Sequence, residues 1–293
     1  MITIMGATGN TGKKIVKSLL ASGEKVRALG RSESKLAELR SSGAETMTGD
    51  IADAGFLATA FRGADAVYTL LADDRRSPDY RAQQDREGEV IVKAVQESGV
   101  QYVVALSSLG ADLSEGTGLL VGLHNQEERL KKLKGINVLF LRPVSFFENF
   151  YDQLGLIKQD GIIADSVIPD LAIPMIAARD IAEAAAAALR KRDWKGTAVR
   201  ELLGQRDLSY VEATRIIAEH IGKPDLTYVQ LPPADMVGAL VQAGLSESFA
   251  GLYLELTSAF NERKITVNRT PENTTPTTFE EFAGELASAY YTA

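Results

Sequence analysis

The sequence contains no cysteine among its 293 residues, which excludes disulfides, thiolate metal sites and thiol catalysis. It has only two histidines, His124 and His220, so no metal centre is expected. No apolar run is long enough to span a bilayer, and an apolar strand begins at the first residue, which leaves no room for a signal peptide. We therefore expect a cytoplasmic protein that does not enter a membrane.

The sequence also has few basic residues relative to acidic ones. Its 32 lysines and arginines against 39 aspartates and glutamates give a formal net charge of −7, which disfavours a broad surface for direct nucleic-acid binding. The hydrophobic share of 45% and the charged share of 24% are ordinary for a globular protein. A chain of this length suits one large α/β domain with an appended lobe better than two independent domains.

The opening residues predict a dinucleotide-binding turn. An apolar strand over residues 1–5 runs directly into GATGNTG at 6–12, and an amphipathic helix follows. Gly6 permits the tight turn, Gly9 lets the backbone approach a pyrophosphate, and Gly12 lets the helix pack closely on the sheet. Free amides at the helix start then face phosphate charge. A plain turn with incidental glycines is disfavoured, because strand and helix both lie where this motif requires them.

Arg31 predicts which coenzyme this turn binds. A strand over 25–29 is followed by Gly30, Arg31 and Ser32. An acidic residue at this position binds the ribose 2′-hydroxyl of NAD, whereas a basic residue accommodates the 2′-phosphate of NADP. The sequence therefore predicts NADP(H), held by a guanidinium–phosphate contact. The alternative is that Arg31 begins a solvated basic helix.

Alternating strands and helices through residue 142 predict a doubly wound parallel sheet of the Rossmann type. Further strands are expected over 44–49, 64–71, 100–106 and 137–141. Ligands bind at the carboxyl ends of such strands. Asp50 should contact the adenine or cap the helix expected over 52–61, and Ser107 should face the nicotinamide or form a turn. A mobile loop over the site is expected at 110–122, followed by a helix over 124–134.

The last part of the chain predicts a smaller α/β lobe. We expect an NAD(P)-binding Rossmann domain over 1–152 and a mixed α/β substrate lobe over 153–293, interleaved with the core around 170–205. Ser209 should cap a helix that ends at residue 221, with Glu212 completing a capping box. Between 234 and 262, an apolar helical face should cover either the substrate cleft or, as the favoured alternative, the lobe's own core. That face consists of Leu252, Leu256, Ala259 and Phe260.

Several stretches resemble the NmrA-like branch of the atypical short-chain dehydrogenases/reductases, and within it the NADPH-dependent quinone oxidoreductases. They are GATGNTG at 6–12, GR at 30–31, GD at 49–50, YVVALSSLGA at 102–111, LRPVSFFEN at 141–149 and ARDIAEAAAAAL at 178–189. The resemblance implies a pyrophosphate site, a 2′-phosphate site, an adenine contact, a ribose site and a nicotinamide site. Together with Gly9, the predicted cofactor residues are Gly6, Thr8, Asn10, Thr11, Gly12, Arg31, Asp50, Leu70, Leu71, Ala72, Ser107, Pro143, Ser145 and Phe146.

The sequence lacks the catalytic pair of main-line members, because no tyrosine is followed four residues later by lysine. A quinone or conjugated dye accepts hydride into a delocalised anion that water protonates later, so a dedicated acid is less necessary. Candidate catalytic residues are Ser107, His124, whose imidazole titrates near neutral pH, and Tyr151. His124 fits a polar residue at the first turn of a helix equally well, and Tyr151 belongs to an aromatic cluster more typical of a core or pocket wall. Arg142 is expected to be a structural ion-pair partner.

The sequence thus predicts an NADPH-dependent oxidoreductase that transfers hydride to a quinone-like or other conjugated aromatic small molecule. The alternative is a non-catalytic NADP(H)-binding redox sensor that acts through a protein partner. The missing catalytic pair supports the sensor modestly, and the aromatic pocket supports the enzyme. An epimerase or isomerase is disfavoured, because those relatives usually keep the tyrosine. A homodimer is the oligomer that we consider alongside the monomer.

Overall fold

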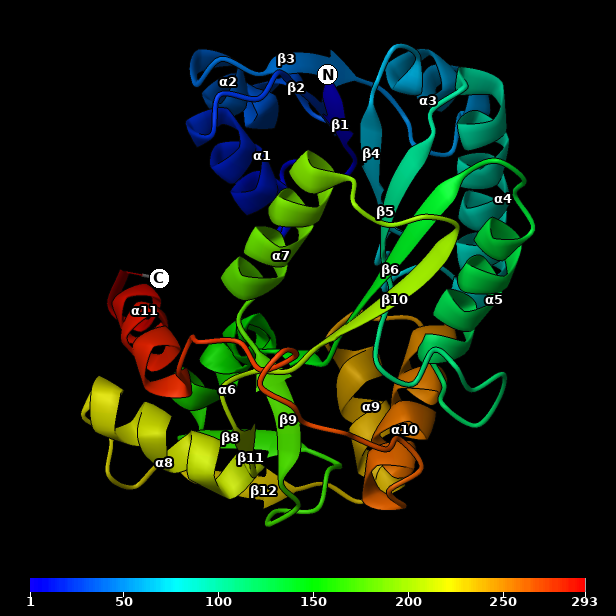
Figure 1. The fold of residues 1–293 in the computed structure, drawn as a ribbon. Coiled ribbons are helices and arrows are strands. Elements are labelled where there is room, and N and C mark those ends of the chain that lie inside the picture. Colours follow the sequence, from blue (N-terminus) through cyan, green and yellow to red (C-terminus); the bar gives the residue numbers. More distant parts are fainter. Residues whose placement is uncertain (293) are drawn as a thin grey trace.

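The computed structural model describes residues 1–292, whose centre is a seven-stranded sheet (Figure 1). The strand order is β10-β6-β5-β4-β1-β2-β3, and every pairing in this sheet is parallel. Because the order reverses on either side of β1, a switch point lies beside this strand, as the sequence predicted for a doubly wound sheet. The strands are β1 (Ile2–Ile4), β2 (Val26–Gly30), β3 (Glu45–Thr48), β4 (Ala66–Thr69), β5 (Tyr102–Leu106), β6 (Asn137–Pro143) and β10 (Thr197–Leu202).

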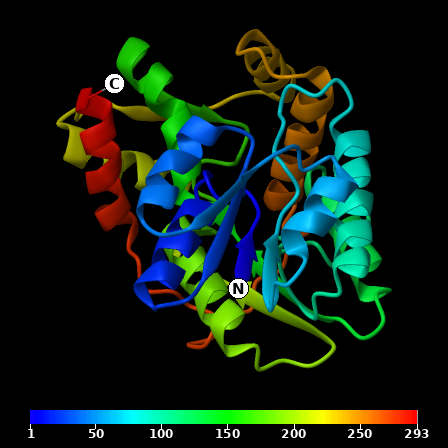
Figure 2. The ribbon, with the colours of Figure 1, turned by 90° about the horizontal axis from the view of Figure 1, so that it is seen from above.

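Helices cover both faces of this sheet (Figures 1 and 2). One face carries α1 (Gly12–Ala21), α2 (Glu33–Ser41) and α7 (Ala178–Lys191), and the other carries α3 (Ala54–Phe61), α4 (Tyr80–Ser98) and α5 (Leu120–Lys131). The central strands β1, β4, β5 and β6 are mainly apolar, as expected where helices bury both faces, whereas the edge strands β3 and β10 carry exposed polar residues. The alanine-rich face of α7 lets this helix approach α1 closely, and β10 then returns the chain to the sheet edge.

A smaller lobe lies beyond the carboxyl edge of the sheet (Figure 1). It holds a three-stranded sheet, β11-β9-β7, and a two-stranded sheet, β12-β8. Its elements are β7 (Ser145–Phe146), the 3-10 helix η1 (Phe147–Gln153), α6 (Leu154–Gln159), β8 (Ile162–Asp165), β9 (Ile173–Ile176), β11 (Asp207–Leu208), α8 (Tyr210–Ile221), β12 (Thr227–Gln230), α9 (Pro233–Gln242), α10 (Glu247–Asn261) and α11 (Phe279–Thr292). Residues of η1, α6, β8, β9, α8 and α11 form a separate core, in which Phe147, Phe150 and Phe279 pack ring against ring. The division at residue 152 stays a prediction.

Two helix starts differ from the sequence predictions. The helix expected from residue 124 begins at Leu120, so His124 lies in its second turn. The helix expected from residue 52 begins at Ala54, because the Asp53 carboxylate accepts hydrogen bonds from the amides of Gly55 and Phe56. The alternative that Asp50 caps this helix is therefore wrong.

The glycine-rich segment before α5 is packed rather than free. A Cβ on Gly118 would lie 1.9 Å from the Leu252 carbonyl oxygen of α10, and the Gly118 carbonyl accepts a hydrogen bond from Arg81 at 2.7 Å. These contacts favour a packed connection over the mobile loop expected from the sequence.

The predicted capping box of α8 is half formed. The Ser209 hydroxyl accepts a hydrogen bond from the Glu212 amide at 3.1 Å, as predicted. The Glu212 carboxylate instead forms an ion pair of 3.2 Å with the Arg206 guanidinium. Among residues 1–292, no helix combines the length and the apolar character needed to cross a bilayer.

Candidate cofactor and acceptor site

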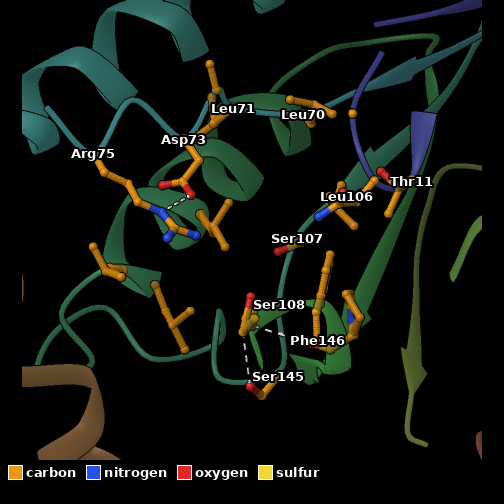
Figure 3. A pocket seen from close by; sticks show the side chains of 18 of the residues that line it. Thr11, Leu70, Leu71, Asp73, Arg75, Leu106, Ser107, Ser108, Ser145 and Phe146 are labelled. Atoms are coloured by element: carbon orange, nitrogen blue, oxygen red, sulfur yellow. Dashed lines mark hydrogen bonds and ion pairs between the residues drawn. The ribbon is translucent and has the colours of Figure 1, made fainter. Parts of the chain in front are cut away.

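A cavity of about 560 Å³ lies at the carboxyl ends of the central strands (Figure 3). This volume is typical of small-molecule and cofactor sites. The sequence prediction accounts for much of its wall, since most predicted cofactor residues line it. They are Gly6, Thr8, Gly9, Asn10, Thr11, Arg31, Leu70, Leu71, Ala72, Ser107, Pro143, Ser145 and Phe146.

The turn between β1 and α1 has the geometry of an anion cradle. Gly6 adopts a φ of 61°, and its carbonyl accepts a hydrogen bond from the Gly9 amide at 2.9 Å. A Cβ on Gly12 would lie 2.2 Å from that carbonyl oxygen, so only glycine permits this close packing of helix and turn. Gly12 itself does not line the cavity. Thr11 provides no side-chain cap for α1, and this leaves the helix start open to a phosphate.

Arg31 lines the end of the cavity that follows β2. Its side chain is exposed, while the neighbouring Ser32 caps α2 by accepting a hydrogen bond from the Lys35 amide. Asp50 lies outside the cavity wall, where its carboxylate accepts a hydrogen bond from the Ala52 amide at 2.9 Å. Ile51 lines the cavity in its place. An adenine contact from Asp50 thus stays a prediction without support from this geometry.

Ser107 lies at the end of β5 with only 6% of its surface exposed (Figure 3). Its hydroxyl donates a hydrogen bond of 2.6 Å to Glu127, and Glu127 accepts two further bonds from Arg142, at 2.8 and 2.7 Å. Arg142 is the structural ion-pair partner that the sequence predicted, and this pairing raises its pKa. Because the hydrogen of Ser107 points toward Glu127, its oxygen presents lone pairs to the cavity. Ser107 is therefore placed to accept a hydrogen bond from a bound group.

The other two candidate acids lie away from the cavity. The Nδ1 atom of His124 is 2.9 Å from the Ala111 carbonyl oxygen, and it is Leu119, Leu120 and Leu123 that line the cavity from this segment. The Tyr151 ring packs edge-on against Phe282, with the ring centroids 5.5 Å apart. Burial raises the Tyr151 pKa. The proton-donor roles of His124 and Tyr151 gain no support from these positions.

A buried carboxylate with two tyrosines closes the lobe side of the cavity, and the sequence analysis missed it. Asp165, 2% exposed, accepts hydrogen bonds from the amides of Ser166 and Val167. Its second oxygen accepts a bond from the Tyr253 hydroxyl at 2.6 Å and a longer one from Tyr210 at 3.4 Å.

These contacts set the protonation of the cluster. Burial raises the pKa of Asp165, and burial together with the nearby carboxylate raises the pKa of Tyr210 and Tyr253 well above 10. Both hydroxyls keep their protons and direct them to Asp165. The tyrosines therefore form an aromatic wall and are poor proton donors.

A charged bridge, also missed, crosses one side of the cavity. The Arg75 guanidinium contacts Asp73 at 2.6 Å and Asp152 at 2.7 Å, and lies 5.6 Å from the centre of the Phe249 ring (Figure 3). The Tyr80 hydroxyl donates a hydrogen bond to Asp73 at 2.8 Å. Asp73 follows β4 directly after the predicted ribose contacts, so extending the strand-end rule by one residue would have found it.

The apolar face of α10 covers the cavity, which was the less favoured alternative. Leu256 and Phe260 line the cavity, together with Tyr253 and Thr257. Ala259 is fully buried but does not line the cavity. A helical stripe predicts burial but does not predict which surface buries it.

A family model described as the NmrA-like family matches residues 1–283. Quinone oxidoreductase 2 of Escherichia coli is 26% identical over 259 residues, which are 86% of this chain and 85% of that protein. An NAD(P)H azoreductase of Xenophilus azovorans is 26% identical over 258 residues, 87% of this chain and 86% of that protein.

The fold matches solved structures over nearly its whole length. The NADPH complex of an Escherichia coli NADPH-dependent quinone oxidoreductase has a TM-score of 0.82 at 23% identity, covering 98% of this chain and 99% of that one. A triphenylmethane reductase from Citrobacter sp., complexed with NADP(H), has a TM-score of 0.80 at 21% identity, covering 98% and 100%.

Proposed function

The chain belongs to the NmrA-like family, and from this premise we propose that it is an NADPH-dependent reductase of quinone-like or other conjugated acceptors. The relatives that it matches over most of their length are named as a quinone oxidoreductase and an NAD(P)H azoreductase. Both names describe reduction of a conjugated small molecule. A non-catalytic sensor is the less favoured alternative.

The residues of the cavity fit a phosphorylated nicotinamide coenzyme. The tight turn at Gly6 and Gly9 and the open start of α1 suit a pyrophosphate. Arg31, exposed and at the end of β2, suits the 2′-phosphate. Ser107 and Phe146 suit the nicotinamide end, where the coenzyme supplies hydride.

The observation that carries the proposal is that three hydroxyl hydrogens near the reacting end are already engaged. Ser107 donates to Glu127, Tyr253 donates to Asp165, and Tyr80 donates to Asp73. An acceptor that needs a proton as hydride arrives, such as a simple ketone, finds no donor in this group. A quinone or azo compound spreads the new charge over its conjugated system, and water can protonate it afterwards. The site therefore favours an activated acceptor and works mainly by positioning.

The proposal is tested by following NADPH oxidation by the purified protein with a panel of quinones and azo dyes. Calorimetry of NADPH binding is run on the same preparation. Binding with turnover of at least one conjugated acceptor is expected. Tight binding without turnover of any acceptor would favour the sensor, and absence of binding would contradict both. A homodimer and a cytoplasmic location stay predictions, the first of which light scattering can test.

A further inference from the structure

A second cavity adjoins the first on the lobe side. Its volume is about 480 Å³, and it lies between η1, α6, α9 and α10. The two cavities share wall residues, among them Arg75, Asn149, Tyr210, Tyr253 and Leu256. A ligand that lies against these residues in the first cavity is therefore next to the second.

Beyond this shared wall the second cavity is lined mainly by apolar residues, with Asp152, Gln153 and Asp165 as its polar ones. Phe150 and Met236 are buried at its inner side, and Leu156, Leu240 and Leu245 line it further out. Ala239 and Ala243 line it from the exposed side of α9. Such a lining favours a hydrocarbon group and offers little to a polar one.

Several polar groups at the shared wall are engaged with one another or with neighbouring side chains. Tyr253 directs its hydroxyl to Asp165, so its ring is what remains for a ligand to contact. Arg75 is held between Asp73 and Asp152 and lies against the Phe249 ring. The boundary between the cavities thus combines the rings of Tyr210 and Tyr253 with an ion-paired cluster, in which Arg75 faces two carboxylates.

A bound coenzyme leaves limited space for an acceptor in the first cavity. The predicted coenzyme contacts extend along the first cavity from the Gly6 turn to Phe146, so a bound coenzyme occupies much of its length. An acceptor larger than a single ring then needs additional room beside the reacting end. The adjoining cavity provides that room.

Building on the proposed function, we propose that the second cavity binds an apolar substituent of the acceptor. The substrate class is then a conjugated ring that carries an alkyl chain or a further aryl group, rather than a bare ring. The ring lies between the nicotinamide end and the Tyr210–Tyr253 wall, and the substituent extends toward α9.

The test compares methyl-benzoquinone with decyl-benzoquinone as ligands of the protein saturated with NADP⁺, measured by calorimetry. The decyl compound should bind at least about tenfold more tightly, because the added methylenes leave water. Ala239→Trp and Ala243→Trp each fill the second cavity from an exposed helix position. Both should abolish most of this preference while leaving the affinities for methyl-benzoquinone and NADP⁺ unchanged.

Val241→Trp is the matched control, because Val241 lies on the same helix, is 37% exposed and is not part of the wall of the second cavity. It should keep the wild-type preference. Equal affinities of the wild-type protein for the two quinones would overturn the inference. A preference for decyl-benzoquinone that survives in both Ala239→Trp and Ala243→Trp would overturn it as well.

The same quinones distinguish this inference from the proposed function. A binding preference without NADPH oxidation by these quinones or by any acceptor of the panel above would reject the reductase and keep the apolar site. Turnover of both compounds without any binding preference would keep the reductase and reject the apolar site.

Discussion

Replacing Arg31 by glutamine should selectively weaken NADPH binding. The guanidinium is exposed at the cavity wall, and among residues 1–292 it forms no ion pair with a carboxylate, so its charge is available to a ligand. Glutamine keeps a polar side chain of similar length and removes the charge. Ser32 caps α2 independently of this side chain, so the helix should remain in place.

The expected magnitude follows from the contact that is lost. A hydrogen bond to a charged group contributes about 1.5–3 kcal/mol, which corresponds to a factor of about 10–150 in affinity. Because Arg31 is exposed and therefore screened by solvent and salt, we expect the lower part of this range, about 10–30-fold. NADH lacks the 2′-phosphate, so its affinity should change by less than about twofold.

Calorimetric titration with NADPH and NADH at low and high ionic strength measures both effects. Arg40→Gln is the control, because Arg40 lies on the nearby helix α2 and contacts Glu33 at 3.2 Å instead of the cavity. It should leave both affinities unchanged. Arg31→Asp should lower the NADPH affinity more than Arg31→Gln does, because the carboxylate repels the 2′-phosphate. Equal losses for the two coenzymes, or no loss for either, would refute the assignment of Arg31 to the 2′-phosphate.

Three further predictions concern the turn and the two buried carboxylates. Gly12→Ala should lower both NADPH affinity and the urea midpoint, because its Cβ would lie 2.2 Å from the Gly6 carbonyl oxygen; wild-type values for both would contradict the role given to the turn. Glu127→Ala should lower the free energy of unfolding by about 3–5 kcal/mol, because it leaves the Arg142 guanidinium, 10% exposed, with only the longer contact of 3.7 Å to the exposed Asp112; urea unfolding measures this, and an unchanged midpoint would count against it. The free energy of unfolding of Asp165→Asn should increase relative to that of the wild type as the pH rises above 3.8. Urea unfolding at acidic and neutral pH checks this, and a constant difference between the two proteins would contradict it.

The sign of the Asp165 prediction follows from its burial. Its native pKa is raised above the ordinary value of 3.8, so the native carboxyl binds a proton more readily than the unfolded one does. This group therefore contributes stability at low pH, and the contribution is lost as the pH rises through the raised pKa. Asparagine does not titrate, so the variant lacks this loss.

The local sequence determined the glycine turn and the order of strands and helices, because these depend on backbone geometry and on the spacing of apolar residues. The glycine spacing of the first turn predicted close packing of the helix at Gly12, and the structure places Gly12 against the Gly6 carbonyl, where no side chain fits. The apolar strands and the helices between them predicted the parallel sheet. The carboxyl ends of its strands then predicted Arg31 and the ribose contacts at Leu70 and Leu71, because the ends of parallel strands meet at one edge.

Only the tertiary structure decided how side chains far apart in the sequence are paired. The Ser107 hydroxyl cannot donate a hydrogen bond to a ligand, because it already donates to Glu127, 20 residues away in the sequence. Asp165 and Tyr253 are 88 residues apart. A polar residue carries no local signal of its distant partner, and an apolar helix face such as that of α10 carries no signal of the surface that it covers. The chemistry at the reacting end therefore depends on how the lobe packs over the sheet, which no local pattern specifies.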